Sequence, residues 1–252
     1  SVIGPLLSDA LSALAFNLDF NLPRLDGATD PATGQPLTIP VALQSDFSAV
    51  DFNSATPGPQ GGALMLRARA TTPSRALPAG TPYENNLGTP MRIGCGLSSQ
   101  SLVIPRVAPM EIVFADDTLN EILHAAWEGG LLQFPVDPAM LGSVDLASYG
   151  VENLTLTVSA LLPPIASDCG SADGQLRLHV GDLQVNAGLD LFGQHLDMIV
   201  YVSFDAPIAL GASDGQLGIT ISAIENVKME IDVQQPDLVG FESTIGDLLA
   251  AQ

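Results

Sequence analysis

Basic side chains are scarce in this chain of 252 residues. Eight Lys and Arg stand against 28 Asp and Glu, so the formal net charge is −20. Proteins bind nucleic acids through Lys and Arg side chains that contact the phosphates. Anionic membrane surfaces attract the same side chains. The charge balance therefore argues against nucleic acid and against anionic lipid surfaces as partners.

Motifs of catalysis and metal binding are missing as well. The chain has no His-Glu-x-x-His, no Gly-x-Ser-x-Gly, no phosphate-binding glycine loop and no dinucleotide-binding fingerprint. Among its three histidines, His124 lies four residues before Glu128 and His195 lies two before Asp197. Neither has a second His or Cys at the spacing of zinc ligands. We therefore expect no enzyme, no metal and no cofactor.

Long apolar runs are absent, since no uncharged apolar stretch reaches 18 residues, and we expect no transmembrane segment. Only 14% of the residues are charged, whereas 46% are hydrophobic and the mean hydropathy is +0.32. Ordinary soluble domains have about 25% charged residues. A surface built from small polar residues is typical of a secreted, periplasmic or cell-surface protein, whose secretory signal would be removed or lie outside this sequence.

Two cysteines are present, and each is followed by a glycine in a turn-like context: Cys95 and Cys169. A disulfide between them in an oxidising compartment would close a long loop and contribute on the order of 4 kcal/mol. Two free thiols in loops are the alternative that the sequence leaves open.

The first part of the chain, residues 1–45, is predicted to form a helix and an extended linker. Its apolar residues have helical spacing from Leu6 to Leu14 and then alternate from Phe16 to Leu22. The segment 26–34 has Asp, Gly and Pro in the pattern of a plain turn, and it lacks the dense oxygen ligands of a calcium loop. Residues 46–252 are predicted to form a single β-rich domain, and the whole chain can be a fragment of a longer one.

The clearest helix signal lies between residues 116 and 130. Thr118 and Glu121 form a capping-box pattern, and Gly129-Gly130 supply the stop. Between these signals the apolar residues repeat with the period of one helix face. They are Leu119, Ile122, Leu123, Ala126 and Trp127.

Strand-like alternation occupies 63–70 and most of the chain beyond Pro138. The later runs are 154–159, 176–180, 183–191, 196–204, 217–221 and 227–233. Their density predicts an α+β, mostly β fold, in which a long and highly curved antiparallel sheet wraps around an amphipathic helix.

This order of parts resembles the bactericidal/permeability-increasing and lipopolysaccharide-binding proteins, and in particular the second barrel of their tubular lipid-binding fold. The resemblance runs from about Val50 onward. It rests on the strand 64–68, a Pro-rich crossing to Met110, the helix from Asp116 to Gly130, and the strand 154–160 closed by Pro163-Pro164. It implies an apolar cleft that accepts acyl chains. A net charge of −20 departs from the cationic tip of that family, so capture of lipopolysaccharide is not implied.

The inward-facing residues of this fold would line the cleft, although ordinary core packing is the alternative for each of them. The leading hypothesis is therefore non-enzymatic binding and shielding of a lipid or other apolar molecule. The rival is a structural or adhesive surface module with a filled core, which would contact other chains through the helix predicted at residues 6–14 and a second helix predicted to begin at residues 244–251. The predicted cleft residues are Leu119, Leu123, Trp127, Leu131, Leu156, Leu178, Val200, Val202 and Ile219.

Overall fold

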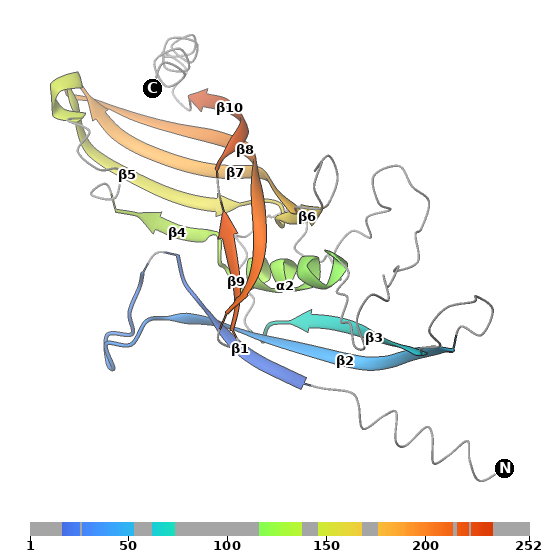
Figure 1. The fold of residues 1–252 in the computed structure, drawn as a ribbon. Helices are drawn as coiled ribbons and strands as arrows, with labels where there is room; N and C mark the ends of the chain where they lie inside the picture. Colours follow the sequence, from blue (N-terminus) through green and yellow to red (C-terminus); the bar gives the residue numbers. More distant parts are fainter. Residues whose placement is uncertain are drawn as a thin grey trace.

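The fold is mostly β, with strands making up 68% of the described residues. A computed structural model describes residues 17–25, 27–52, 62–73, 116–137, 146–167, 176–213, 216–221 and 223–233. The predicted helices near the two ends, the Pro-rich crossing and both cysteines lie outside these ranges. The disulfide thus stays a prediction. Figure 1 shows two antiparallel sheets with the helix α2, Asp116–Glu128, between them.

The smaller sheet has the order β1-β2-β3, formed by Asn17–Pro23, Thr38–Phe52 and Gly62–Thr71. The predicted strands before Pro23 and around 63–70 are confirmed. The strand β2 was not predicted, and it runs through position 45, where the two predicted parts of the chain meet. Between β1 and β2 the carboxylate of Asp30 accepts the backbone N–H of Ala32 at 2.8 Å, an Asx turn that accounts for the plain turn expected there.

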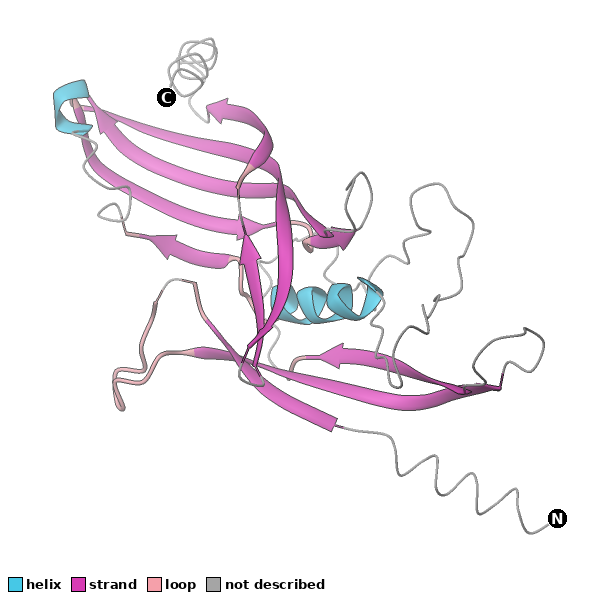
Figure 2. Ribbon diagram, viewed as in Figure 1, coloured by secondary structure: helices cyan, strands magenta, loops and turns pink. Residues whose placement is uncertain are grey.

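The larger sheet is antiparallel and has the order β10-β8-β7-β5-β4, with β6 paired to β7 and β9 paired to β8. A short 3₁₀ helix, Leu146–Tyr149, precedes β5. Figure 2 shows that the sheet is strongly curled. Its strands are β4 Gln133–Val136, β5 Val151–Ala160, β6 Ile165–Ser167, β7 Leu176–Leu191, β8 Gln194–Ser213, β9 Gln216–Ile221 and β10 Glu225–Val233.

Three β-bulges contribute to this curl. The pairing register shifts in β5, β7 and β10, and each shift contains a residue with positive φ: Asn153 (51°), Asp182 (49°) and Asn226 (53°). Asn and Asp tolerate this left-handed backbone better than other non-glycine residues. Since a bulge bends its strand and increases the local twist, bulges in three of its strands curl the sheet.

The bulge in β7 also explains a difference from the sequence prediction, in which 176–180 and 183–191 were separate strands. They form one strand, in which Val180 pairs with Phe204 and Leu183 pairs with Val202 of β8. The apolar alternation moves from even to odd positions at the bulge. The extra residue therefore keeps the apolar side chains on one face of the sheet.

The strand β8 bends sharply at the point where its partner changes from β10 to β9 (Figure 1). Asp205 still pairs with β10, whereas Ile208 pairs with β9. Pro207 lies between them, paired with Arg177 of β7. Proline has no N–H to donate, so within sheets it is tolerated at irregular points such as this one.

The helix α2, Asp116–Glu128, confirms the helix predicted from the apolar stripe, but it begins two residues before Thr118, so Thr118 lies inside the first turn and is not its N-cap. The glycine stop is confirmed as well, because Gly130 has a φ of +87°. One side of α2 packs on the smaller sheet, where Ala125 and Ile122 meet Ile39 and Val41 of β2. Burial of this apolar surface stabilises the contact at about 25 cal/mol per Å².

Two side chains of α2 bond to the larger sheet. Asn120 is 3% exposed and donates to Ala166 O at 2.9 Å, while its own Oδ1 accepts the N–H of Ala166 at 2.7 Å. One amide thus satisfies both backbone groups of a residue in β6. Trp127 is fully buried and donates Nε1–H to Ala160 O of β5 at 2.9 Å. These three bonds join the helix to the curled sheet.

Candidate functional site

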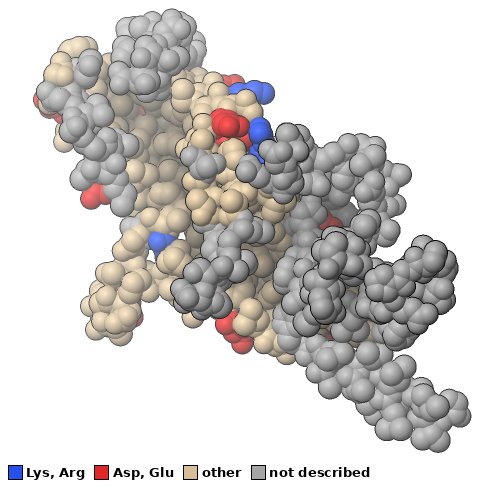
Figure 3. Space-filling model, in the orientation of Figure 1, with Lys and Arg blue, Asp and Glu red and all other residues tan. Residues whose placement is uncertain are grey.

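The candidate site is an apolar face of the curled sheet, formed by alternate residues of β5, β7, β8 and β10. Its centre is a cluster with three buried side chains, Ala187, Leu196 and Met198. Others packed against them are only half-buried, and their remaining exposed surface would be covered by an apolar ligand. In Figure 3 uncharged residues form most of the hollowed surface of this sheet. The half-buried members are Leu156, Leu189, Val200 and Ile231.

Strand register places some of the predicted cleft residues together. Leu156 and Val200 belong to this cluster. Val202 and Leu178 are half-buried and lie on the same face of β8 and β7, as the pairing of Leu183 with Val202 and of Leu178 with Ala206 shows. Ile219 pairs with Leu210 in the hairpin of β8 and β9, and its side chain lies outside the described part of the chain.

The predicted cleft residues in and just after the helix lie elsewhere. Leu131 packs with the cluster of Ile39, Val41 and Leu43 on the smaller sheet. Trp127 is fully buried between α2 and β5, with its ring centroid 5.5 Å from that of His124. Leu119 and Leu123 are half-buried on α2. The structure therefore separates a helix group from the sheet group.

Five members of the apolar cluster were missing from the sequence-based set. They alternate in phase with the predicted Leu156 and Val200, so the signal was present in the strand pattern. The sequence does not show which strands pair and at which register, and so it could not rank these residues. The five are Ala187, Leu189, Leu196, Met198 and Ile231.

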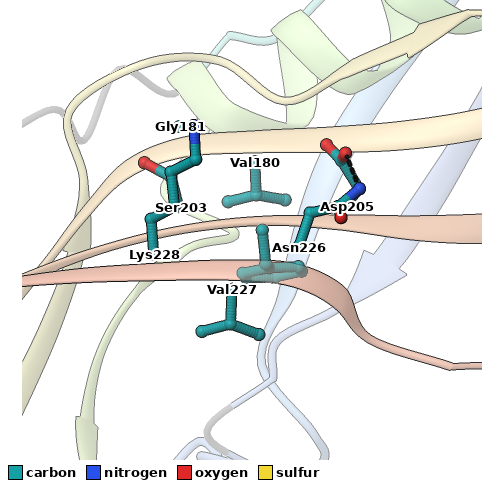
Figure 4. A pocket seen from close by; sticks show the side chains of 8 residues that line it. Val180, Gly181, Ser203, Asp205, Asn226, Val227 and Lys228 are labelled. Carbon is teal, nitrogen blue, oxygen red and sulfur yellow. Dashed lines mark hydrogen bonds between the residues drawn. The ribbon is translucent and has the colours of Figure 1, made fainter.

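A surface depression of about 550 Å³ lies beside the bulges of β7 and β10 and opens to solvent. Figure 4 shows the hydrogen bond from Asn226 to Asp205 at its wall. Polar and charged groups share its lining with apolar ones, and none of the predicted cleft residues belongs to it. Its lining residues are Val180, Gly181, Ser203, Phe204, Asp205, Asn226, Val227 and Lys228.

An exposed charged cluster surrounds His195 near the turn between β7 and β8. His195 Nδ1 lies 2.8 Å from Asp190 Oδ1, and its Nε2 lies 3.3 Å from Asp197 Oδ1. The hydrogen bond to Asp190 and the charge of Asp197 raise the pKa of His195. Hydrogen bonds from Asn153 and His195 lower the pKa of Asp190. The cluster thus stabilises an imidazolium on an acidic protein.

The variant Asp190→Asn is expected to lower the pKa of His195, measured by proton NMR titration of the ring. His195 gains its partners on folding, so its charge contributes stability below the unfolded pKa of about 6.5, and this contribution is lost as pH rises through the higher folded value. Glu230→Gln removes the same charge from β10 and serves as the control. Equal shifts in the two variants would contradict a role for the hydrogen bond from Asp190.

In the described ranges, no group of three or more His, Cys, Asp or Glu is placed to hold a metal ion. Nor does this part of the chain contain a helix long and apolar enough to cross a membrane. No family model matches the chain, and no curated protein is significantly similar to it.

Proposed function

We propose that this protein binds a lipid or another apolar molecule on the apolar face of its curled sheet and shields it from water. The proposal includes a tubular lipid-binding fold and a secreted, periplasmic or cell-surface location. The observation that carries it is the row of half-buried apolar side chains on one face of β5, β7, β8 and β10. Such a surface favours acyl chains over charged ligands, because burial of apolar area drives binding.

The binding step requires no reaction. Its free energy comes from removing ligand carbon and the cluster side chains from water, so affinity is expected to rise with acyl-chain length by up to about 0.8 kcal/mol per buried CH₂. The low content of Lys and Arg supports a ligand recognised by its apolar part rather than by phosphate groups.

A matched pair of variants tests this proposal. Val200 and Ile199 are consecutive, half-buried and apolar, and the alternation of β8 places them on opposite faces. Val200→Asp puts a carboxylate on the apolar face and is expected to weaken uptake of a fluorescent fatty acid at least about tenfold, since a charge on this face is costly to desolvate. Ile199→Asp is expected to retain uptake. Equal uptake by both variants and the parent would refute the site.

A second candidate function, a structural or adhesive module, is supported by exposed apolar residues along β9 and β10. Ile221, Ile224 and Val227 are 57%, 63% and 52% exposed, and Met229 is 45% exposed. Clustered apolar residues at a surface mark contacts with other molecules. Mass spectrometry of an organic extract from protein purified without detergent separates the two functions. A lipid present in stoichiometric amount supports lipid binding. A lipid-free extract, no uptake of added fatty acid and stable self-association together support the structural or adhesive function.

A further inference from the structure

A serine, a histidine and an aspartate form a continuous hydrogen-bonded chain across three strands of the larger sheet. Ser167 Oγ lies 3.2 Å from His179 Nε2, and His179 Nδ1 lies 2.7 Å from Asp205 Oδ1. The residues come from the end of β6, from β7 and from β8. A hydroxyl within reach of one ring nitrogen, with a carboxylate on the other, is the arrangement of an activated serine nucleophile.

Strand pairing places these side chains on one face. Ile165 pairs with His179, and His179 pairs with Asp205. Ser167 lies two residues after Ile165 and so points to the same side of β6. The apolar residues Leu178 and Val180 alternate with His179 and therefore point to the opposite face. The Ser167–His179–Asp205 chain is thus separate from the proposed lipid-binding surface.

The carboxylate at the end of this chain is held in place and charged. Asn226 donates to Asp205 Oδ2 at 2.8 Å, and the guanidinium of Arg177 lies 4.0 Å from the same oxygen and 3.4 Å from Glu225. The hydrogen bond from Asn226, followed by that from His179, lowers the pKa of Asp205 against the opposing effect of desolvation. An ionised Asp205 can only accept, so Nδ1 of His179 carries the proton.

In the neutral ring, this proton position determines the direction of the second bond. With Nδ1 protonated, Nε2 of a neutral His179 is an acceptor, and the hydroxyl of Ser167 donates to it. The lone pairs of Ser167 Oγ remain available for attack on a carbonyl carbon. Ser167 is 1% exposed, which closes its hydroxyl to small reagents as well as large ones in this conformation, so reaction requires local opening at the end of β6.

We propose that Ser167 is a nucleophile that His179 and Asp205 activate toward small carboxylic esters. Ser167 Oγ would bond to the carbonyl carbon while its proton passes to His179 Nε2. The bond from that carbon to the alcohol oxygen would then break. His179 would donate its proton to that oxygen, and the alcohol would leave. Water would attack the acyl-serine, pass a proton through His179 back to Ser167 and release the acid.

Intact-protein mass spectrometry after incubation with diisopropyl fluorophosphate tests the proposal on the unmodified chain. We expect one added diisopropylphosphoryl group, which peptide mapping places on Ser167. The variants Ser167→Ala and His179→Gln are expected to react at least about tenfold more slowly, because the constellation acts as a unit. Hydrolysis of p-nitrophenyl acetate is expected to fall in parallel.

Two control variants make the result specific. Ser203→Ala removes another hydroxyl of the sheet, which accepts the N–H of Asp182 at 3.2 Å. His195→Ala removes a second histidine that is bonded to an aspartate. Both are expected to leave labelling unchanged. No adduct on the parent, an adduct at another residue, or equal ester hydrolysis by the parent and Ser167→Ala would overturn the proposal. Fatty-acid uptake by Ser167→Ala should be unchanged, so this proposal and the proposed lipid binding can fail separately.

Discussion

Replacing Trp127 by alanine is expected to lower the free energy of unfolding by about 3 to 5 kcal/mol. The indole is fully buried between α2 and β5, and no other side chain of the described core with so little exposure is as large. Its removal would leave a cavity and an unpaired carbonyl oxygen on Ala160. Urea unfolding followed by circular dichroism measures the change.

Two further variants separate size from hydrogen bonding at this position. Trp127→Phe retains most of the buried ring but loses the N–H that Ala160 O accepts, and we expect a smaller loss of about 1 to 3 kcal/mol. Phe192→Ala removes an aromatic ring that is 80% exposed, and its effect is expected to stay within about 0.5 kcal/mol. If Trp127→Ala and Phe192→Ala changed the free energy of unfolding by similar amounts, the proposed role of Trp127 in holding α2 against the larger sheet would be contradicted.

The variant Asn120→Ala is expected to lower the free energy of unfolding by about 2 to 4 kcal/mol. It leaves both the N–H and the carbonyl of Ala166 without their partner in a buried environment, where each unpaired group costs about 1 to 3 kcal/mol. Ala166 is itself 0% exposed, which keeps water from replacing the amide. The same urea unfolding experiment measures this change.

Gln184→Ala is the control for Asn120→Ala. Gln184 also uses its amide in a hydrogen bond, but the partner is the side chain of Asn186, and the pair is half-buried. Its removal is expected to cost less than about 1 kcal/mol, since water reaches the remaining group. If Gln184→Ala lowered the free energy of unfolding as much as Asn120→Ala, the two hydrogen bonds to Ala166 would not contribute more than an ordinary half-buried hydrogen bond.

Elements with strong local signals were predicted correctly. The helix α2 has acidic residues at its start, one apolar stripe and a glycine stop, and these act within a few residues of one another. The alternating runs that became β5, β8 and β10 are equally local. By contrast, β4 and β6 have four and three residues, which is too short for a period to stand out. In β2, Pro40 argues against a strand, and Ser45 interrupts the apolar alternation of Ile39, Val41 and Leu43.

The candidate site was predictable only in part. Leu156 and Val200 lie in the apolar cluster, because alternation by itself assigns a residue to one face of its strand. Trp127 and Leu131 share the same apolar character, yet they pack in other parts of the molecule. Side-chain chemistry alone does not distinguish a core from a binding surface, since both require the same residues.

The Ser167–His179–Asp205 chain has no counterpart in any linear motif. Its members are separated by 12 and 26 positions, and they meet only because β6, β7 and β8 pair at one particular register. A shift of one residue would turn His179 to the opposite face. The even-to-odd change of the apolar pattern around Asp182 was the one trace of the neighbouring bulge in the sequence.

The sequence by itself determined the mostly β composition, the position and C-terminal end of the helix, and the acidic, weakly charged composition. Each of these depends on residue type or on a period that repeats within a short segment. Only the tertiary structure decided which strands pair, where Asn153, Asp182 and Asn226 bend them, and which side chains meet across the sheet. These features depend on contacts between distant segments, whose register no local pattern specifies.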